Sequence, residues 1–452
     1  MIDMIGVGPF ITIPLIISAM GGPQAMLGWI LGAILAMCDG MVWAELGAAL
    51  PGSGGTYKYL GEMFGEKKFG MVMSFLFIWQ LIFSAPLSIA SGCIGLAQYS
   101  GYYFPKLGRT ILTLPIPLPG FIHSAVTVSG FSFVAILACS IAVFLLYRKI
   151  SVINKLARSL WIVVMATVAW IIYSGVTHFN GSLAFDFPEG AFSLSRNFLL
   201  GLGSAMLISV YDYWGYYNVC FLGDEIREPK KTIPRAIMIS IALVAVIYII
   251  MNISILGVIP WRELTNGGRN GYFLISAMME QLYGRWAGGL ATILIMWTAF
   301  ASVFALLLGY SRIPYAAAID GNFFKIFGRL HKKHRFPYVS LLTLGFFAAL
   351  FCFLSLSEVI AALVVIRIII QFLSQTAGLI AWRWRYPDSP RPFKMWLYPA
   401  PAIISLAGFS FVLFSRKNFE HELSYAAIIL VAGLIIYFVR AYSKREWPFA
   451  GD

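Results

Sequence analysis

Residues 211–236 combine residue types that seldom share one membrane-spanning helix. The segment begins as an aromatic run inside a long apolar stretch, and it holds a carboxylate, Asp212, and a glycine, Gly215. Because a carboxylate in hydrocarbon costs several kcal/mol, an acid at this depth is a candidate functional residue. Glycine beside bulky aromatic residues is a point where a membrane helix can break and present its backbone to a ligand. The pattern predicts a ligand pathway through a membrane.

A second interruption lies in the first apolar span, where Gly6, Val7, Gly8 and Pro9 follow one another. Proline removes a backbone donor and glycine loosens the helical turn. The two interrupted spans are the first and the sixth, which are corresponding members of two consecutive five-span halves. Such a matched pair indicates a binding site between inverted repeats of a secondary transporter. The alternative is a pair of ordinary kinks, whose freed backbone groups neighbouring helices can satisfy.

The composition places the whole chain in a membrane. Hydrophobic residues make up 60% and charged residues 12% of the 452, with a mean hydropathy of +0.80. Apolar runs long enough to cross a bilayer core of about 30 Å as a helix recur along the chain. They lie near 3–19, 25–50, 68–97, 130–147, 156–175, 196–220, 236–259, 287–312, 338–356, 359–382, 398–415 and 423–441. We therefore expect an all-α polytopic protein with twelve transmembrane helices in one domain, 1–452.

The distribution of charge indicates how the chain sits in the bilayer. The net charge is +13, but the basic residues mark the ends of apolar spans and form no contiguous patch, so nucleic acid is not an expected partner. Segments on the side of the two termini carry about three times as many lysine and arginine residues as those on the other side. We expect an integral protein of the cell membrane with both termini in the cytoplasm and the lipid bilayer as its surroundings.

The five cysteines all lie within apolar segments. A disulfide framework or a metal site would need clustering that the sequence does not show, so small buried residues are the expected role. The loops predicted to face outward contain no cysteine. We therefore expect no disulfide-linked partner, no bound metal and no cofactor.

Four motifs carry a family resemblance. They are GVGPFITIP at 6–14, AELGAALPGSGGTYKYL at 44–60, GDEIREPKKTIPRAI at 223–237 and LGYSRIPYAAAIDG at 308–321. Together they resemble the amino acid–polyamine–organocation permeases over nearly the whole chain. The motifs at 44–60 and 223–237 are the more specific ones. The first-span motif and the aromatic sixth span look most like the polyamine and L-type amino acid branch.

The resemblance implies the leucine-transporter fold, with inverted five-helix repeats at about 1–178 and 196–384 and two more helices at about 396–441. It implies transport by alternating access and no enzymatic activity. The backbone at 6–9 would bind the charged ends of the substrate, and Tyr211 would close over it. Tyr213, Trp214 and Gly215 would shape the pocket. Asp224 and Glu225 would form ion pairs at the inner surface, although topology and solvation explain them equally well.

Two departures from the family bear on the coupling ion. Most amino acid permeases have a small residue at the position of Asp212, so its charge changes the expected electrostatics. The fifth span, at about 161–175, lacks the lysine that some sodium-independent members use in place of a cation. Thr298 and Ser302 offer hydroxyls where sodium-coupled relatives bind sodium. We expect a proton as the coupling ion in preference to sodium.

Other polar residues are predicted within the membrane. Asp39 could titrate with a coupling proton or form half of a structural ion pair. Arg367 must face a cavity or a partner, for which Asp39, Asp212 or Glu358 could serve, or else it snorkels or braces a gate. Gln371 and Gln375 follow at intervals of four residues on the same helical face, which makes Gln371 a pocket or gate candidate.

Trp79 and Gln80 lie in the middle of the third span, which lines the pocket in the related fold, although lipid-facing packing would also suit the tryptophan. Asp212 favours a substrate with a positive group, such as a cationic amino acid or a polyamine. A neutral amino acid is the alternative if Asp212 is protonated or paired with Arg367. A sensor that does not transport and an intramembrane enzyme are remote alternatives, and no catalytic residue is expected.

Overall fold

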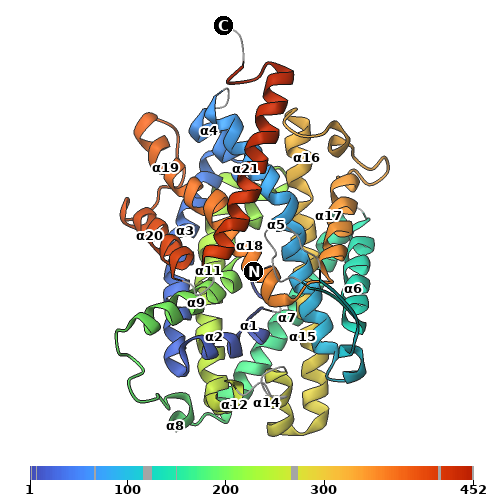
Figure 1. Ribbon diagram of the computed structural model, residues 1–452, viewed down its shortest axis with the longest axis vertical. Helices are drawn as coiled ribbons and strands as arrows, with labels where there is room; N and C mark the ends of the chain where they lie inside the picture. Colours follow the sequence, from blue (N-terminus) through green and yellow to red (C-terminus); the bar gives the residue numbers. More distant parts are fainter. Residues whose placement is uncertain are drawn as a thin grey trace.

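The computed structural model describes residues 1, 3–6, 8–65, 68–115, 125–148, 150–265, 273–415 and 419–449. Within these ranges the chain is nearly all helical (Figure 1). Seven helical stretches are long and apolar enough to cross a membrane: Pro23–Ala49, Phe69–Ser100, Val152–Thr177, Pro229–Leu256, Arg285–Ile319, Leu363–Arg385 and Ala426–Lys444. Shorter apolar helices cover Gly130–Leu146, Tyr338–Phe351 and Ala400–Phe414. The two remaining predicted spans are the interrupted ones, and the total of twelve stays a prediction.

The helices of the first half are α1 (Gly8–Ile11), α2 (Ile13–Met20), α3 (Met26–Ala49), α4 (Thr56–Phe64), α5 (Phe69–Ser100), α6 (Gly130–Leu146), α7 (Ile150–Thr177) and α8 (Gly181–Ala184). Those of the second half are α9 (Arg196–Tyr213), α10 (Asn218–Phe221), α11 (Pro229–Leu256), α12 (Trp261–Thr265), α14 (Leu274–Tyr283), α15 (Arg285–Tyr310), α16 (Arg312–Ile319), α17 (Tyr338–Phe351), α18 (Leu356–Arg367) and α19 (Ser374–Arg385). The last two helices are α20 (Ala400–Phe414) and α21 (Phe419–Lys444). Short 3-10 turns cover Pro23–Ala25, Pro105–Gly108, Gly223–Glu225 and Lys325–Gly328, and a π-helical turn, η5 (Ile368–Leu373), joins α18 to α19.

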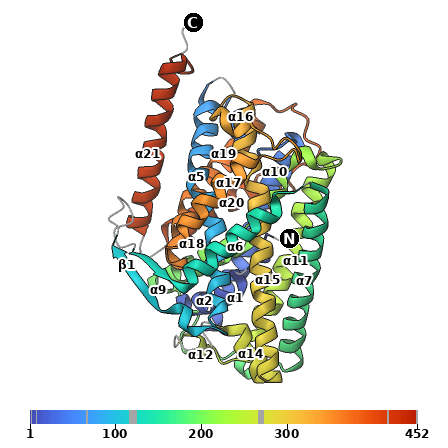
Figure 2. The same cartoon turned by 90° about the vertical axis from the view of Figure 1, so that its right-hand side faces the viewer.

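One hairpin departs from the all-α expectation. Strands β1 (Thr110–Pro115) and β2 (Ala125–Ser129) pair antiparallel beside the lower part of α21 (Figure 2), with Thr113 opposite Thr127. Both strands are rich in threonine, valine, isoleucine and leucine, which suit a pleated surface, and this local preference was overlooked.

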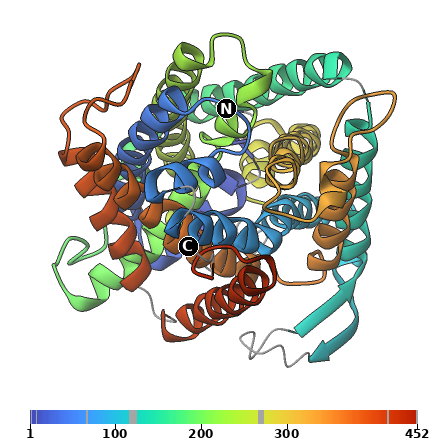
Figure 3. The ribbon, with the colours of Figure 1, turned by 90° about the horizontal axis from the view of Figure 1, so that it is seen from above.

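Helices α3 and α5 lie at the centre of the packing. Helix α3 packs against α9, α11 and α20, whereas α5 packs against α6, α15 and α18 (Figure 3). Helix α21 lies along α5 at the edge of the molecule. The short helices α1 and α2 of the interrupted first span lie inside this arrangement and contact α5 and α9. The breaks are thereby held in the interior of the molecule.

The outer helices expose large apolar side chains rather than polar ones. Phe133, Leu137 and Phe144 on α6, Phe346 on α17 and Val439 on α21 are all more than half exposed. A soluble monomer seldom exposes so large an apolar surface, whereas lipid-facing helices require it. The protein is therefore integral to a membrane.

The cysteines are buried as expected, but three of them are not isolated. Cys93 on α5 lies within hydrogen-bonding reach of Cys139 on α6 and of Cys352, which follows α17. The sequence could not show this clustering, because it arises from the packing of three helices far apart along the chain. Within the described residues no group of histidine, cysteine and acidic side chains is arranged to hold a metal ion.

Candidate binding site between two helix breaks

The two predicted breaks face each other. Residues 3–6 form turns before α1 begins at Gly8, and the sixth span is interrupted between α9 and α10. Gly215 makes the second break with φ +111°, a left-handed conformation that L side chains rarely adopt. A Cβ atom at Gly215 would also lie 2.6 Å from a carboxylate oxygen of Asp3. Glycine is therefore required at this position both for its conformation and for the close approach of the first span.

A cavity lies between the breaks. Its lining comes from the first, third, sixth, eighth and tenth predicted spans and comprises Asp3, Met4, Gly6, Gly8, Ser88, Ser91, Gly92, Tyr211, Asp212, Trp214, Gly215, Tyr217, Ser302, Leu306, Tyr310, Leu363 and Arg367. The space open to the centres of water molecules is about 50 Å³. At roughly 10–15 Å³ for each water, it would hold only a few. The cavity fits a small polar head group, and a larger ligand would require the surrounding helices to move.

Asp212 connects the two breaks. Its Oδ2 atom accepts a hydrogen bond from the hydroxyl of Thr12, whose oxygen also lies 2.8 Å from the carbonyl oxygen of Gly8. Its Oδ1 atom has no hydrogen-bond partner in the described part of the chain and lies against Gly8, where a Cβ atom would collide with it. An acceptor buried without a partner is costly, so Oδ1 is a ready site for a donor supplied by a ligand.

Arg367 contributes the cation of the cavity and is only 2% exposed. It donates to the hydroxyl of Tyr217 at 2.9 Å and to the carbonyl oxygen of Ser84 at 3.1 Å. Its guanidinium carbon lies 5.1 Å from the ring centre of Tyr310 and 5.6 Å from that of Trp214. These contacts hold the planar head in place while leaving Nε unsatisfied among the described groups.

Of the three partners considered for Arg367, Asp39 and Asp212 do not lie within ion-pair distance of it. The side chain of Glu358, the third predicted partner, lies outside the described residues. Asp3 shares the cavity with Arg367 and accepts a hydrogen bond from Asn218. The cavity therefore holds opposite charges that do not neutralise each other by direct contact. Such an arrangement can bind a ligand with separate cationic and anionic groups.

The structure brings most of the predicted pocket residues together. Gly6, Gly8, Tyr211, Asp212, Trp214, Gly215, Ser302 and Arg367 all line the cavity. The ring of Tyr211 is held by a 2.8 Å hydrogen bond between its hydroxyl and that of Ser91. Val7 lies outside the described residues. Pro9 is buried in α1 and does not line the cavity.

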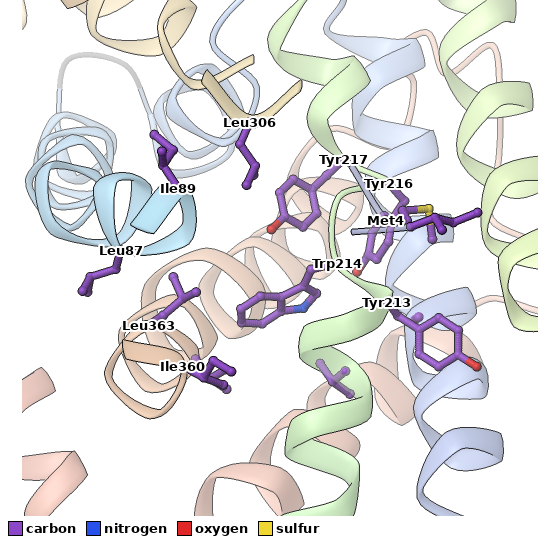
Figure 4. Packing of buried hydrophobic residues seen from close by; sticks show 14 of the residues in the cluster. Met4, Leu87, Ile89, Tyr213, Trp214, Tyr216, Tyr217, Leu306, Ile360 and Leu363 are labelled. Atoms are coloured by element: carbon purple, nitrogen blue, oxygen red, sulfur yellow. The ribbon is translucent and has the colours of Figure 1, made fainter. Parts of the chain in front are cut away.

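Tyr213 is placed away from the cavity. Figure 4 shows Trp214 and Tyr217 directed toward Leu363 and Leu306, whereas Tyr213 points to the opposite side. Its ring packs edge-on against Trp29, with centroids 5.7 Å apart. Tyr213 is the last residue of α9, and the change of backbone direction after it sends consecutive side chains to different sides.

The two third-span candidates, Trp79 and Gln80, also lie elsewhere. The indole of Trp79 donates to the carbonyl oxygen of Ile429 at 2.8 Å and packs against Gly433, so it faces α21 rather than the cavity. Gln80 is fully buried, but its side chain is not part of the lining. The cavity-lining residues of α5 are instead Ser88, Ser91 and Gly92, and sequence reasoning missed the two serines. Their spacing of three residues within an apolar span was the available signal.

The two hydroxyls considered for sodium differ in position. Ser302 lines the cavity and lies 3.3 Å from the carbonyl oxygen of Asp3. Thr298 donates to the carbonyl oxygen of Leu294 in its own helix at 2.9 Å and does not line the cavity. The two residues therefore do not form one shared site around this space.

Of Arg367, Gln371 and Gln375, which the sequence analysis placed on one helical face, only Arg367 lines the cavity. The π-helical turn η5 follows Arg367 directly, and its wider i to i+5 bonding shifts the phase of the helix. Gln371 is buried outside the cavity lining. Gln375 instead accepts a 2.6 Å hydrogen bond from Thr56. Only Arg367 points to the cavity.

Asp39 lies behind the second break rather than in the cavity. It is fully buried, and it accepts hydrogen bonds from Tyr216 at 2.5 Å and from Ser405 at 3.4 Å. No basic side chain in the described ranges lies within ion-pair distance of it. The structural ion pair considered for Asp39 is thus absent there, which leaves its carboxyl group linked to the break through Tyr216.

Asp224 and Glu225 lie on the 3-10 turn after α10 and contact the loop after α3 and the start of α16, a helix in the upper part of Figure 1. The backbone nitrogen of Ser53 donates to Asp224 at 3.0 Å, and Arg312 forms an ion pair with Glu225 at 3.1 Å. These contacts join the loop after α3 and the start of α16 to the end of the sixth span. At the same end, the buried Glu45 accepts hydrogen bonds from Arg383 and from the backbone nitrogen of Met395 at 2.7 Å.

Sequence reasoning also missed Asp3, Tyr217 and Tyr310 in the cavity lining. Asp3 was a detectable signal, because it is an acid at the edge of an apolar span close to a glycine-rich break. The tyrosines carried no comparable signal, since aromatic residues are frequent throughout the chain. Their role depends on Arg367, which lies more than fifty residues further along the sequence.

A charged cavity between two interrupted membrane helices is the architecture of a secondary transporter. Over residues 1–438 the chain matches the amino acid permease family. It is 23% identical to the branched-chain amino acid permease BcaP of Bacillus subtilis (strain 168), over 98% of this chain and 92% of that protein. It is 26% identical to the serine/threonine exchanger SteT of the same organism, over 96% and 93% of the two chains. It is also 26% identical to the b(0,+)-type amino acid transporter 1 of Mus musculus, over 94% of this chain and 82% of that one.

The chain therefore belongs to the amino acid permease family. The resemblance inferred from the four motifs is confirmed, and so is the expectation that the protein is a transporter rather than an enzyme. The internal repeats at 1–178 and 196–384 remain a prediction.

Proposed function

We propose that this permease carries α-amino acids across the cell membrane by alternating access and that it binds them between the two helix breaks. The unpaired Oδ1 atom of Asp212 receives the ammonium group, and Arg367 attracts the carboxylate. The observation that carries the proposal is the presence of both charges, without direct pairing, in one buried cavity. The relatives named above are amino acid transporters and exchangers, which supports the same substrate class.

Within that class we propose a cationic amino acid. The cavity holds two carboxylates, Asp3 and Asp212, and one guanidinium, Arg367. An ionised site of this composition has one excess negative charge, which a substrate with two positive groups and one negative group would balance. Arg367 weighs against a polyamine. Its guanidinium would repel such a cation, which has no anionic group for the guanidinium to bind. The polyamine alternative is therefore the weaker one.

A neutral amino acid is the second candidate. The cavity of about 50 Å³ suits a small zwitterion, and protonation of one carboxyl group would remove the excess charge. The named relatives include proteins for branched-chain amino acids and for serine and threonine. A neutral substrate would therefore bind together with a proton, so this candidate includes proton coupling.

We further propose that a proton is the coupling ion and that Asp39 takes part in its movement. The carboxyl group of Asp39 is buried, has no basic partner among the described residues and is hydrogen-bonded to Tyr216 within the second break. Movement of the break would change its hydrogen bonding. The excess of basic residues on the side of the termini supports a cytoplasmic location for both ends.

Uptake into proteoliposomes tests these proposals. Arginine, leucine, serine and putrescine are compared with and without proton and sodium gradients, for the wild type, Asp212→Asn and the exposed control Asp388→Asn. We expect saturable arginine uptake that is driven by a proton gradient and reduced at least tenfold in Asp212→Asn, a loss of about 1.4 kcal/mol or more. The control should transport normally.

Leucine or serine transport that survives Asp212→Asn would contradict the ammonium assignment and favour the neutral candidate. Uptake driven by sodium but not by protons would overturn the coupling proposal. Putrescine transport that exceeds arginine transport would overturn the role given to Arg367.

A further inference from the structure

A groove outside the central cavity runs between α6 and α17, which pack side by side in Figure 1. It is lined by Cys139, Ser140, Val143, Phe144, Tyr147, Leu342, Gly345, Phe346 and Ala349, and its free space is about 440 Å³. Gly345 allows the two helices to approach closely, because a Cβ atom there would lie 2.6 Å from the side chain of Val143. The groove is thus a depression between two closely approaching helices.

The groove opens toward the lipid. Phe144 and Phe346 on its two walls are 60% and 61% exposed, and Leu342 is 46% exposed. From Cys139 to Tyr147 it follows eight residues of α6, which corresponds to about 12 Å along the helix axis. An apolar depression of this length, open to the bilayer, matches part of an acyl chain rather than a polar solute.

A cation lies at one end of the groove. The guanidinium carbon of Arg148 is 4.7 Å from the ring centre of Phe144, a residue of the groove wall. One of its nitrogens donates to the carbonyl oxygen of Tyr147 at 3.2 Å, while the side chain as a whole remains exposed. Arg148 therefore lies where an apolar chain leaving the groove would meet a head group.

A basic loop packs against the same end. The ring of Tyr147 lies 4.9 Å from that of Phe336 and 5.0 Å from that of His331, which places the loop beside Arg148. Arg335 directly precedes Phe336, and Lys332 and Lys333 lie between the two contact points, all with exposed side chains. Arg148 and these three residues form no ion pair within the described ranges. Their positive charge is available to an external anion.

We propose that this groove is a binding site for an anionic phospholipid, with one acyl chain between α6 and α17 and the phosphate near Arg148 and Arg335. Such a lipid has an apolar acyl chain joined to a charged head group. The groove has the same order, because its apolar walls open toward the lipid and its cations lie at a single end. A basic pocket between membrane helices at the membrane surface is a known means of selecting anionic head groups. The site is separate from the central cavity and does not depend on the transported substrate.

Photolabelling in nanodiscs tests the proposal. The purified protein is placed in phosphatidylcholine that contains a small fraction of phosphatidylglycerol with a photoreactive group in one acyl chain, and labelled peptides are identified by mass spectrometry. We expect labels within 139–147 and 342–349. The variant R148Q/R335Q should lose about tenfold of this labelling, because two cationic contacts with the head group are removed. The control R196Q/R285Q removes two exposed charges elsewhere and should label normally.

A second variant blocks the apolar groove without changing any charge, and its elution profile shows whether it is still folded. Ala349→Phe fills the groove from its wall but leaves both arginines, and it should also lose the label while eluting as a monodisperse protein. Equal labelling by photoreactive phosphatidylcholine, or unchanged labelling in R148Q/R335Q, would overturn the site. Competition by free inorganic phosphate at millimolar concentration would overturn its assignment to a lipid.

Discussion

At the scale of single residues, Asp212 and Gly8 depend on each other. Asp212 can approach the first span because Gly8 has no side chain, and the hydroxyl of Thr12 then binds its second oxygen. The sequence shows both residues, but they are separated by about two hundred positions, so their contact could not be inferred from spacing. It follows from the packing of the two breaks.

This dependence predicts the behaviour of Gly8→Ala. The added methyl group would collide with Asp212, displace its carboxylate and break the bond to Thr12. Overpacking of this kind costs about 1–3 kcal/mol, so thermal unfolding in detergent should shift to lower temperature and uptake should be largely lost. Gly181→Ala is the matched control, because a Cβ atom there meets only ordinary contacts.

The double variant Gly8→Ala/Asp212→Ser separates the two effects. The shorter side chain makes room for the methyl group, so thermal stability should return while arginine uptake should not. Full transport by Gly8→Ala alone would refute the close packing of the two residues.

At the scale of helices, the structure shows which elements are fixed to each other. The fully buried carboxylate of Glu45 on α3 binds Arg383 on α19 and the backbone nitrogen of Met395. The guanidinium carbon of Arg383 also lies 3.8 Å from the ring centre of Tyr398. One carboxylate thus joins α3, the end of α19 and the connection to α20. Glu45 belongs to the motif at 44–60, and its position near the inner surface favours a structural role, which these contacts describe.

Glu45→Gln should therefore destabilise the protein strongly. Removing one partner of a buried ion pair leaves the other charge uncompensated, which costs about 3–5 kcal/mol. Glu228→Gln provides the comparison, because its pair with Lys231 is 3.2 Å long but both side chains are more than 70% exposed. An exposed pair contributes about 0–1 kcal/mol, so this variant should unfold almost as the wild type does. Equal shifts in the two melting curves would show that the Glu45 contacts do not hold the helices together.

The helices and the breaks were largely predictable, whereas the orientation of the side chains was not. Apolar run length identified the spans, and glycine next to proline or aromatic residues identified the interruptions at Gly8 and Gly215. A π-helical turn follows Arg367, and no residue type in the sequence predicts such a turn. Trp79 was misplaced because its partner, α21, lies far along the chain. Such positions depend on tertiary packing, which a single sequence does not encode by spacing.

At the scale of the whole molecule, the polar contacts at its upper end in Figure 1 are candidates for a gate. The Arg312–Glu225 ion pair and the Ser53–Asp224 hydrogen bond hold that end around the interrupted sixth span. A two-state transporter responds to the loss of such contacts by a shift of population, because they exist in only one of its states. Loss of the Arg312 ion pair should favour the state that is open at this end.

Arg312→Gln should therefore increase access to the cavity from this end. A cysteine introduced at Ser88 reports access through its rate of reaction with a membrane-impermeant thiol reagent, and the five native cysteines are buried. We expect the rate from this side to rise about tenfold, equivalent to about 1.4 kcal/mol of population shift. Asp186→Asn breaks an exposed ion pair with Arg262 at the opposite end and should not change it. An unchanged rate in Arg312→Gln would show that this ion pair is not part of a gate.

The short interruption between α9 and α10 meets a carboxylate on each of its two sides. Asp212 precedes it and faces the cavity, while Tyr216 within it binds Asp39 on the far side. A single displacement of this stretch would change the surroundings of Asp212 and of Asp39 at once. Coupling between the two carboxylates therefore requires no long chain of intervening residues. Under the proton coupling proposed above, the Tyr216–Asp39 hydrogen bond is the contact that keeps substrate movement tied to proton movement. In the proton-coupled mechanism proposed above, loss of the Tyr216 hydroxyl would let substrate cross without a proton, so the protein would no longer use a proton gradient to accumulate substrate.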